Sequence, residues 1–178
     1  QIYGLAVSTF ENTKEAIGTV LTIRASKKKV KSKDEETIMV TGVKKEEDSW
    51  IQNSINKMIH VVDFPRKSKY HVDFMQTIGT DGPSAGVAMT LALQSVIGEK
   101  PIRQDIAVTG EINLEINGKV TVTPVGGIHE KIIAAQNCGF RKACIPKRNY
   151  ELNVNPSDYS IKIVPCGTLD DYKKEVFI

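Results

Sequence analysis

The chain has 178 residues, of which 40% are hydrophobic and 25% are charged. These fractions are typical of a soluble globular domain with one core, and they disfavour disorder, collagen and a coiled coil. Lysine and arginine number 24 against 21 acidic residues, a formal net charge of +3, which permits weak attraction to polyanions without requiring it. No apolar run approaches the roughly 18 to 20 residues of a membrane-spanning helix, and no signal peptide opens the chain.

Two features of the chain bear on its context. The sequence begins at Gln1 rather than Met, so we expect that it was cut or processed from a longer protein. Its three cysteines, Cys138, Cys144 and Cys166, are an odd number for a disulfide framework and favour a reducing compartment. No CxxC pair is present and the three histidines lack paired-ligand spacing, so we predict ordinary thiols and no metal site.

The first half of the chain is expected to be mainly β-structure followed by one helix. The helix is predicted from about residue 46 to residue 62, because its apolar residues recur on one face, and Phe64-Pro65 should end it. Short apolar runs predict strands at residues 2–9, 18–25, 37–41 and 70–75. The apolar face of the helix comprises Ile51, Ile55, Met58, Ile59 and Val62.

The second half alternates helices and strands. Residues 79–82 form a glycine-containing loop before a helix at 83–97 that is apolar nearly all round and should be buried. A helix at residues 128–138 should end at Gly139, a favourable residue for a helix C-terminus. Strands are expected at 105–108, 142–145 and 161–164, one hairpin arm at 118–122, and a short helix at 169–174. Short connections and the absence of a repeat predict a single α/β or α+β domain with mixed sheets and packed helices.

A lysine-rich segment at residues 26–36 separates two predicted strands. Lys27, Lys28 and Lys29 begin a run of lysines that three acidic residues follow. A nucleic-acid patch and a solvated hairpin loop both fit this pattern. We favour the loop, because no aromatic residue is interleaved and the acids cancel much of the charge.

Ser84 lies at the start of the predicted buried helix, after the sequence Gly79-Thr80-Asp81-Gly82-Pro83. The N–H groups in the first turn of a helix lack helical partners, so they can stabilise an oxyanion beside a nucleophile. Gly82 and Gly86 would let a substrate backbone approach closely. The alternative is that Ser84 simply caps the helix.

Lys131 is the second candidate for chemistry. On a helical wheel at about 100° per residue, it falls on the apolar side between Ala135 and Cys138, while Glu130 falls on the polar side. An inward lysine is costly unless it is paired or neutral, and burial lowers the pKa of a lysine, so the neutral amine can act as a general base. The alternative is a lysine whose stem carries the amine to water.

Neither segment offers a histidine for a Ser-His-Asp triad, since His129 falls on the wheel away from Lys131. A serine activated by a lysine remains as the simplest nucleophilic arrangement.

Three motifs together resemble the proteolytic domain of Lon proteases. They are Asp81-Gly82-Pro83-Ser84-Ala85-Gly86, Thr109-Gly110-Glu111-Ile112, and the run from Pro124-Val125-Gly126-Gly127 to Ile128-His129-Glu130-Lys131. Their order and spacing match, and the resemblance covers essentially the whole of residues 1–178. Any one of these motifs alone would be weak.

The resemblance implies a serine–lysine dyad endopeptidase with the α/β fold of that family. Ser84 matches the nucleophile, Lys131 the general base, and Thr109 a residue that orients the lysine. Asp81 matches an acidic position beside the nucleophile, and Gly82 and Ala85 belong to the loop that would hold the oxyanion. The Ser84 oxygen is then expected about 2.6–3.2 Å from the Lys131 amine.

The resemblance also implies partners. Substrates would be unfolded or misfolded polypeptides, delivered by an AAA+ ATPase module, and the full protein would assemble as a hexameric ring in protein quality control. No G-x-x-x-x-G-K-[ST] motif occurs here, so no cofactor is expected in this domain, and ATP and magnesium would serve only an upstream ATPase. The expected location is the cytoplasm, or the mitochondrial matrix or another organelle in a eukaryote.

The sequence departs from the family pattern in three places. The hairpin at residues 114–122 is longer, His129 replaces a residue that is often lysine, and the segment between Thr41 and Tyr70 is shorter. These differences affect substrate access and subunit contacts rather than the dyad. A non-proteolytic Lon-fold module that binds nucleic acid or protein is the alternative function, and we do not favour it because Ser84, Lys131 and Thr109 are all present.

Overall fold

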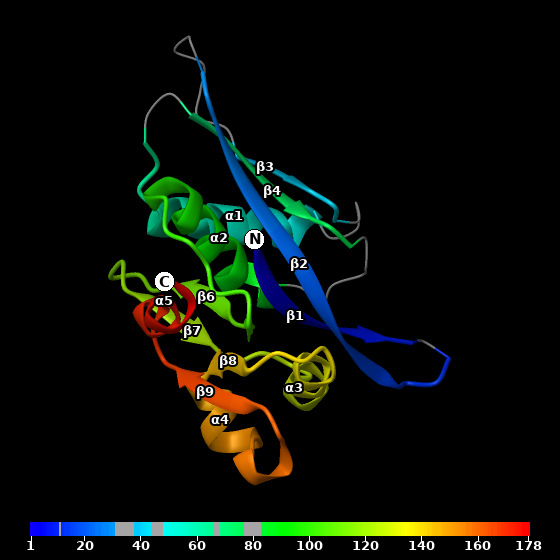
Figure 1. The fold of residues 1–178 in the computed structure, drawn as a ribbon. Coiled ribbons are helices and arrows are strands. Elements are labelled where there is room, and N and C mark those ends of the chain that lie inside the picture. Colours follow the sequence, from blue (N-terminus) through cyan, green and yellow to red (C-terminus); the bar gives the residue numbers. More distant parts are fainter. Residues whose placement is uncertain (11, 31–37, 44–47, 66–67, 77–82) are drawn as a thin grey trace.

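The computed structural model describes residues 1–10, 12–30, 38–43, 48–65, 68–76 and 83–178, and it leaves out the side chains of residues 48–52. Its helices are α1 (Asp48–Val61), α2 (Gly86–Gly98), α3 (Ile128–Asn137), α4 (Lys147–Asn153) and α5 (Leu169–Val176). Its strands are β1 (Ile2–Thr9), β2 (Ala16–Lys29), β3 (Ile38–Thr41), β4 (Ser68–Phe74), β5 (Ile106–Val108), β6 (Glu111–Leu114), β7 (Val120–Thr123), β8 (Lys142–Pro146) and β9 (Lys162–Cys166). The predicted mixed α/β fold is confirmed (Figure 1).

Seven strands form one sheet in the order β3-β4-β2-β1-β5-β8-β9. Strand β2 pairs antiparallel with β1 and with β4, whereas β1, β5, β8 and β9 run parallel to one another. The strands β6 and β7 form a separate hairpin. Strand β2 continues past Ile23, the partner of Ile2 in β1, so its second half forms one end of the sheet together with β4 and β3 (Figure 1).

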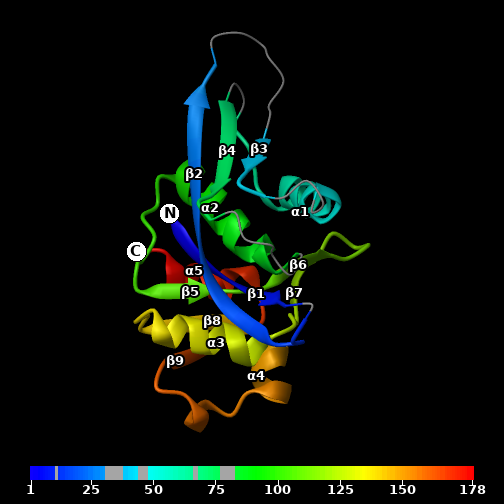
Figure 2. The same ribbon diagram turned by 90° about the vertical axis from the view of Figure 1, so that its right-hand side faces the viewer.

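Two hydrophobic clusters cover the two faces of the sheet. Successive residues of β5 and β8 alternate between them, because side chains of a strand point to opposite faces: Val108 and Cys144 belong to the cluster of α1, α2 and α5, while Ala107 and Ala143 belong to the cluster of α3. Figure 2 shows α2 and α3 on opposite sides of β1 and β5. Different helices therefore cover the two faces of the central strands.

Several sequence predictions are corrected by the structure. Residues 26–29 were expected in a solvated loop, yet they belong to β2, where Lys27 pairs with Tyr70 and Lys28 with Lys69. Pairing with β4 outweighs the local preference of lysine for a loop. Ile59, placed on the buried face of the first helix, is 49% exposed, while Met58 is buried.

Two further differences concern the second half. Cys138 is exposed, although the wheel placed it on the apolar side of α3, because the helix ends at Asn137 before its next turn. Helix α4 was not predicted from the sequence. The predicted loop at residues 79–82 and the lysines at 31 and 33 lie outside the described residues.

Cys138, Cys144 and Cys166 are all free thiols. Within the described parts of the chain, no helix is long and apolar enough to cross a membrane.

Candidate active site

The segment that carries Ser84 is a buried turn in front of helix α2. Residues Pro83–Ala85 form a single 3-10 turn, and Ser84 is 5% exposed. The residue at the N-cap of α2 is Ala85 rather than Ser84. In the first turn, the Val87 N–H already donates to the Gly110 carbonyl at 3.1 Å. The alternative that Ser84 serves as the cap of this long helix is therefore not supported.

The serine turn is fastened to the segment that follows β5. The Gly110 N–H donates to the Ser84 carbonyl at 3.1 Å, and the Gly110 carbonyl accepts the bond from Val87. These two bonds hold both sides of the turn against one residue. Gly110 suits this position because a Cβ there would lie 2.9 Å from a methyl group of Val87.

Thr109 follows the carboxyl end of β5 and is completely buried. Its N–H donates to the Cys144 carbonyl at 3.1 Å, and its hydroxyl donates to the Leu5 carbonyl at 3.4 Å. Thr109 thus links β1, β5 and β8 at the edge where the parallel strands end, which is where open α/β sheets usually place their binding sites.

Lys131 lies in the first turns of α3 and has no exposed surface. It is among the largest fully buried side chains of the described residues. The wheel prediction of an inward lysine is confirmed, and the alternative of a stem that reaches water is wrong. Lys131 and Ser84 both take part in interactions within the molecule.

The position of α3 is set by two glycines. Gly127, the N-cap of α3, has a positive φ of 59°, and a Cβ there would meet Val7 of β1 at 2.5 Å. Gly18 of β2 lies so close to the main chain of Glu130 that no side chain fits between them. The start of α3 therefore packs directly on β1 and β2. This contact fixes the distance between the sheet and the turn of α3 that carries Lys131.

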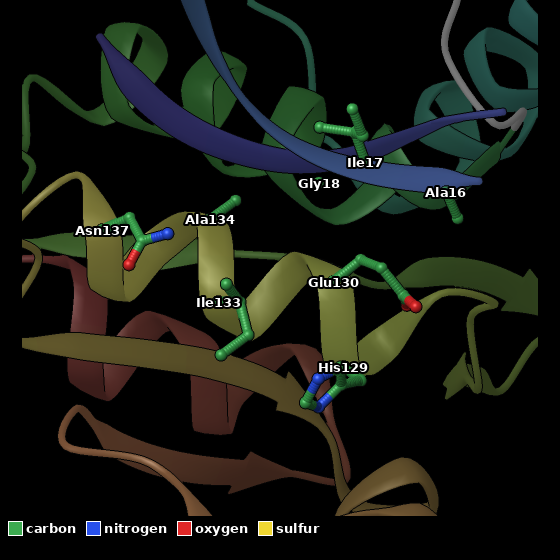
Figure 3. A pocket seen from close by; sticks show the side chains of 8 residues that line it. All are labelled: Ala16, Ile17, Gly18, His129, Glu130, Ile133, Ala134 and Asn137. Atoms are coloured by element: carbon green, nitrogen blue, oxygen red, sulfur yellow. The ribbon is translucent and has the colours of Figure 1, made fainter. Parts of the chain in front are cut away.

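A hollow of about 370 Å³ lies on the other side of α3, against the start of β2 (Figure 3). Its lining is partly apolar and partly polar, and consists of Ala16, Ile17, Gly18, His129, Glu130, Ile133, Ala134 and Asn137. His129 Nδ1 also hydrogen-bonds the Tyr159 hydroxyl at 2.8 Å. Ser84, Thr109 and Lys131 do not line this hollow, so it is separate from the three candidates.

Of the remaining candidates, the structure describes only Ala85. Ala85 is buried beside Ser84, whereas Asp81 and Gly82 lie outside the described residues. Among the described residues, no group of three or more histidine, cysteine or acidic side chains is arranged to hold a metal ion.

Two contacts beside Thr109 and Gly110 were not predicted from the sequence. Glu111 forms an ion pair with Lys57 of α1 at 3.0 Å, which ties α1 to the start of β6. Tyr172 of α5 donates its hydroxyl to the Thr109 carbonyl at 2.8 Å. A helical pattern signals the burial of Tyr172, since Leu169, Tyr172 and Val176 recur on one face of α5 and are all buried.

The sequence comparisons identify the family. The model of the Lon protease (S16) C-terminal proteolytic domain matches residues 3–178. The chain therefore belongs to this family, as its three motifs predict. The family description is that of a proteolytic domain.

Individual relatives agree with this assignment. The archaeal Lon protease of Pyrococcus abyssi is 36% identical over 162 residues, which cover 88% of this chain and 16% of that protein. Lon protease 3 of Sorangium cellulosum is 37% identical over 133 residues, or 73% of this chain and 16% of the relative. The Lon protease of Campylobacter concisus is 39% identical over 102 residues, which cover 55% of this chain and 12% of that protein. The chain spans less than a fifth of the length of these three relatives.

Proposed function

We propose that this chain is a serine endopeptidase domain in which Ser84 is the nucleophile and Lys131 the general base. The observation that carries the proposal is the complete burial of Lys131, in a chain of the Lon proteolytic family whose serine turn is fastened by two main-chain hydrogen bonds. Burial disfavours the ionised amine, and a neutral amine can accept a proton from a serine hydroxyl.

The proposed reaction has two stages. Lys131 Nζ takes the proton of Ser84 Oγ as that oxygen attacks the peptide carbonyl, and then gives the proton to the leaving amine. A water molecule deprotonated by Lys131 then attacks the acyl-enzyme and releases Ser84. The main-chain N–H groups of Gly82 and Ala85 are proposed to hold the oxyanion, because charge develops there in the transition state.

Thr109 and Asp81 are assigned supporting parts. Thr109 is buried at the carboxyl end of β5, and its hydroxyl bond to Leu5 holds the side chain between β1 and β5. We propose that it orients the Lys131 amine. Asp81 is proposed to shape the loop before Ser84 rather than to take part in proton transfer.

The setting of the reaction is proposed by analogy with the family. Substrates are proposed to be unfolded polypeptides, delivered by an AAA+ ATPase module that uses ATP and magnesium, within a homo-oligomeric, hexameric ring. The three free thiols agree with a reducing compartment such as the cytoplasm.

Labelling of the purified full-length protein with a fluorophosphonate probe tests the proposal. The wild-type protein should be labelled at Ser84 and should cleave an unfolded polypeptide, while Ser84→Ala should do neither. The rates of labelling and of polypeptide cleavage should both rise from neutral to mildly alkaline pH, as the Lys131 amine loses its proton. Robust cleavage by Ser84→Ala, or flat activity down to about pH 5 where histidines and carboxylates titrate, would refute the assignment.

A further inference from the structure

We propose that Tyr172 is a positioning residue for the nucleophile: its hydroxyl fixes the peptide group that holds the Ser84 turn. This inference rests on the proposed peptidase function and adds to it a residue that lies outside the three family motifs.

The first step is the contact itself. Tyr172 is completely buried in α5, and its hydroxyl donates to the Thr109 carbonyl at 2.8 Å. Helix α5 is held at its start by a capping box, in which the Thr168 hydroxyl accepts from the Asp171 N–H and Asp171 accepts from the Thr168 N–H. The ring is therefore fixed by packing and by the cap, and the hydroxyl reaches the active-site edge from the C-terminal helix.

The second step is the geometry of one peptide unit. The carbonyl of Thr109 and the N–H of Gly110 belong to the same planar group. Tyr172 binds the carbonyl end of this group, while the Ser84 carbonyl accepts from its N–H end at 3.1 Å. Because the group is rigid, rotation at one end moves the other, and hydrogen bonds in such a chain also polarise one another. The hydroxyl of Tyr172 thus sets the orientation of the N–H that holds Ser84.

The third step is the fit around Gly110. A Cβ at residue 110 would lie 2.9 Å from the Tyr172 hydroxyl oxygen and 2.9 Å from a methyl group of Val87. Only glycine leaves room for the hydroxyl on one side and for α2 on the other. The close approach shows that the tyrosine hydroxyl, the peptide group and the start of α2 form one packed unit.

The donor is available at every working pH. Burial raises the pKa of Tyr172 well above its ordinary value, and the neighbouring Cys166, Cys144 and Asp171 raise it further. The hydroxyl therefore keeps its proton. The Thr109 N–H is held at the same time by the Cys144 carbonyl, so Thr109 is bound at both ends of its main chain.

The test is Tyr172→Phe in the full-length protein, which removes the hydroxyl and keeps the ring. We expect kcat for an unfolded polypeptide and the rate of inactivation by a fluorophosphonate to fall about tenfold, because a small misplacement of a reacting group costs this much or more. KM should change less than about twofold, since the substrate does not touch Tyr172.

Tyr70→Phe is the matched control. Tyr70 of β4 is 2% exposed, close to the 0% of Tyr172, and its hydroxyl donates to the Pro65 carbonyl at 3.5 Å, away from Thr109. This variant should keep the wild-type kcat and inactivation rate when both proteins are assayed well below their unfolding temperatures. An equal loss of kcat in the two variants would show a general effect of losing a buried hydroxyl and would overturn the proposal.

The outcomes separate this inference from the proposed function. Wild-type protein that neither cleaves nor is labelled refutes the peptidase function, and the positioning part falls with it. If the wild-type protein is active and Tyr172→Phe is equally active, the role proposed for Tyr172 is overturned and the peptidase function stands. If Tyr172→Phe fails to fold, Gly110→Ala displaces the Tyr172 hydroxyl together with the Val87 side chain, and unchanged kcat in that folded variant would also contradict the proposal.

Discussion

The segment Thr109–Gly110 and the outer sheet, which comprises residues 24–29 of β2 with β3 and β4, are held in different ways. Thr109–Gly110 is bonded to β1, β8, the serine turn and α5, which come from across the whole chain. The outer sheet is held by strand pairing, by local side-chain bonds such as that of Thr41 to Asp73 at 2.6 Å, and by the packing of Tyr70, Val72 and Phe74 in the core. The small segment Thr109–Gly110 therefore joins many elements by hydrogen bonds, whereas the outer sheet is hydrogen-bonded mainly within itself and joins the helices by apolar packing of one face.

This difference predicts where substitutions act. A change at Thr109–Gly110 or at the residues it holds should alter the position of catalytic groups, because buried hydrogen bonds tolerate little displacement. A change on the exposed face of the outer sheet should alter the free energy of unfolding by tenths of a kcal/mol.

Ser84→Ala, Lys131→Ala and the double variant should show the largest effect. Each single change should lower kcat for peptide cleavage by on the order of 10³-fold or more, and the double change should be little worse, because residues that act as one unit are not additive. Thr109→Ala should be milder if it only orients the amine. Single-turnover cleavage of an unfolded polypeptide measures all four variants.

Folding of these variants serves as the control. Ser84→Ala removes one hydroxyl and should keep the fold, while Lys131→Ala removes a group whose ionised form is costly to bury. Additive losses of the two single changes in a folded double variant would contradict a shared mechanism.

Gly127→Ala should destabilise the protein by about 2 to 4 kcal/mol, through a left-handed backbone and a clash with Val7. The change should also lower kcat, because it lifts the helix that carries Lys131. Urea unfolding and peptide cleavage measure the two effects.

Two other glycines separate the cost of the left-handed backbone from the cost of the clash with Val7. Gly139→Ala keeps only the backbone cost of about 1 to 2 kcal/mol, since its φ is 79° and nothing lies within 4 Å. Gly126→Ala should be close to neutral, because its surroundings are also open and its φ is not in the left-handed region. Equal destabilisation by Gly127→Ala and Gly139→Ala would show that the Val7 contact does not matter.

The sequence predicted the parts of this site that local patterns encode. The inward face of α3 placed Lys131 because helical periodicity depends only on spacing, and the three motifs identified the family. Most strands of the main sheet were likewise predicted from short apolar runs.

Tertiary contacts explain what could not be predicted. Lysines 27–29 continue β2 only because β4 pairs with them. The bond of Tyr172 to Thr109 joins residues 63 positions apart, and no local pattern specifies such a partner. Asp81 and Gly82 stay predictions, since they lie outside the described residues.

Asp171→Asn should weaken the capping box of α5 and lower the free energy of unfolding by about 1 kcal/mol at neutral pH. Burial alone would raise the pKa of the Asp171 carboxyl. Hydrogen bonds from Thr168 and Gly167, together with the nearby Lys174, outweigh burial and hold this pKa below its ordinary value. A carboxyl with a lowered folded-state pKa stabilises the protein above its unfolded pKa and loses that contribution as the pH falls.

Denaturant unfolding from about pH 7 to pH 2 measures this contribution. The gap between wild type and Asp171→Asn should narrow below about pH 4, where the carboxyl takes up its proton. Asp158→Asn is the control, because Asp158 lies at another helical turn and caps no part of α5. A gap of constant size across this pH range would contradict the part assigned to the Asp171 charge.

Lys69→Glu should have the smallest effect and should act in the opposite direction. Lys28 and Lys69 are directly opposite in the β2–β4 pair, and like charges in such a pair destabilise a sheet. Reversal of one charge should therefore stabilise the protein by about 0.3 to 0.5 kcal/mol at low salt, less at high salt, with kcat unchanged. Thermal unfolding at two salt concentrations measures it. Lys162→Glu should gain less, because its partner in the parallel pair, Lys142, is already paired with Glu175 at 2.7 Å. The same lysines distinguish the alternative function, because a nucleic-acid-binding module would lose salt-dependent affinity when Lys27, Lys28 and Lys29 are neutralised. A peptidase domain should instead keep its cleavage rate in that triple variant, since the outer sheet contributes no bond to Thr109–Gly110.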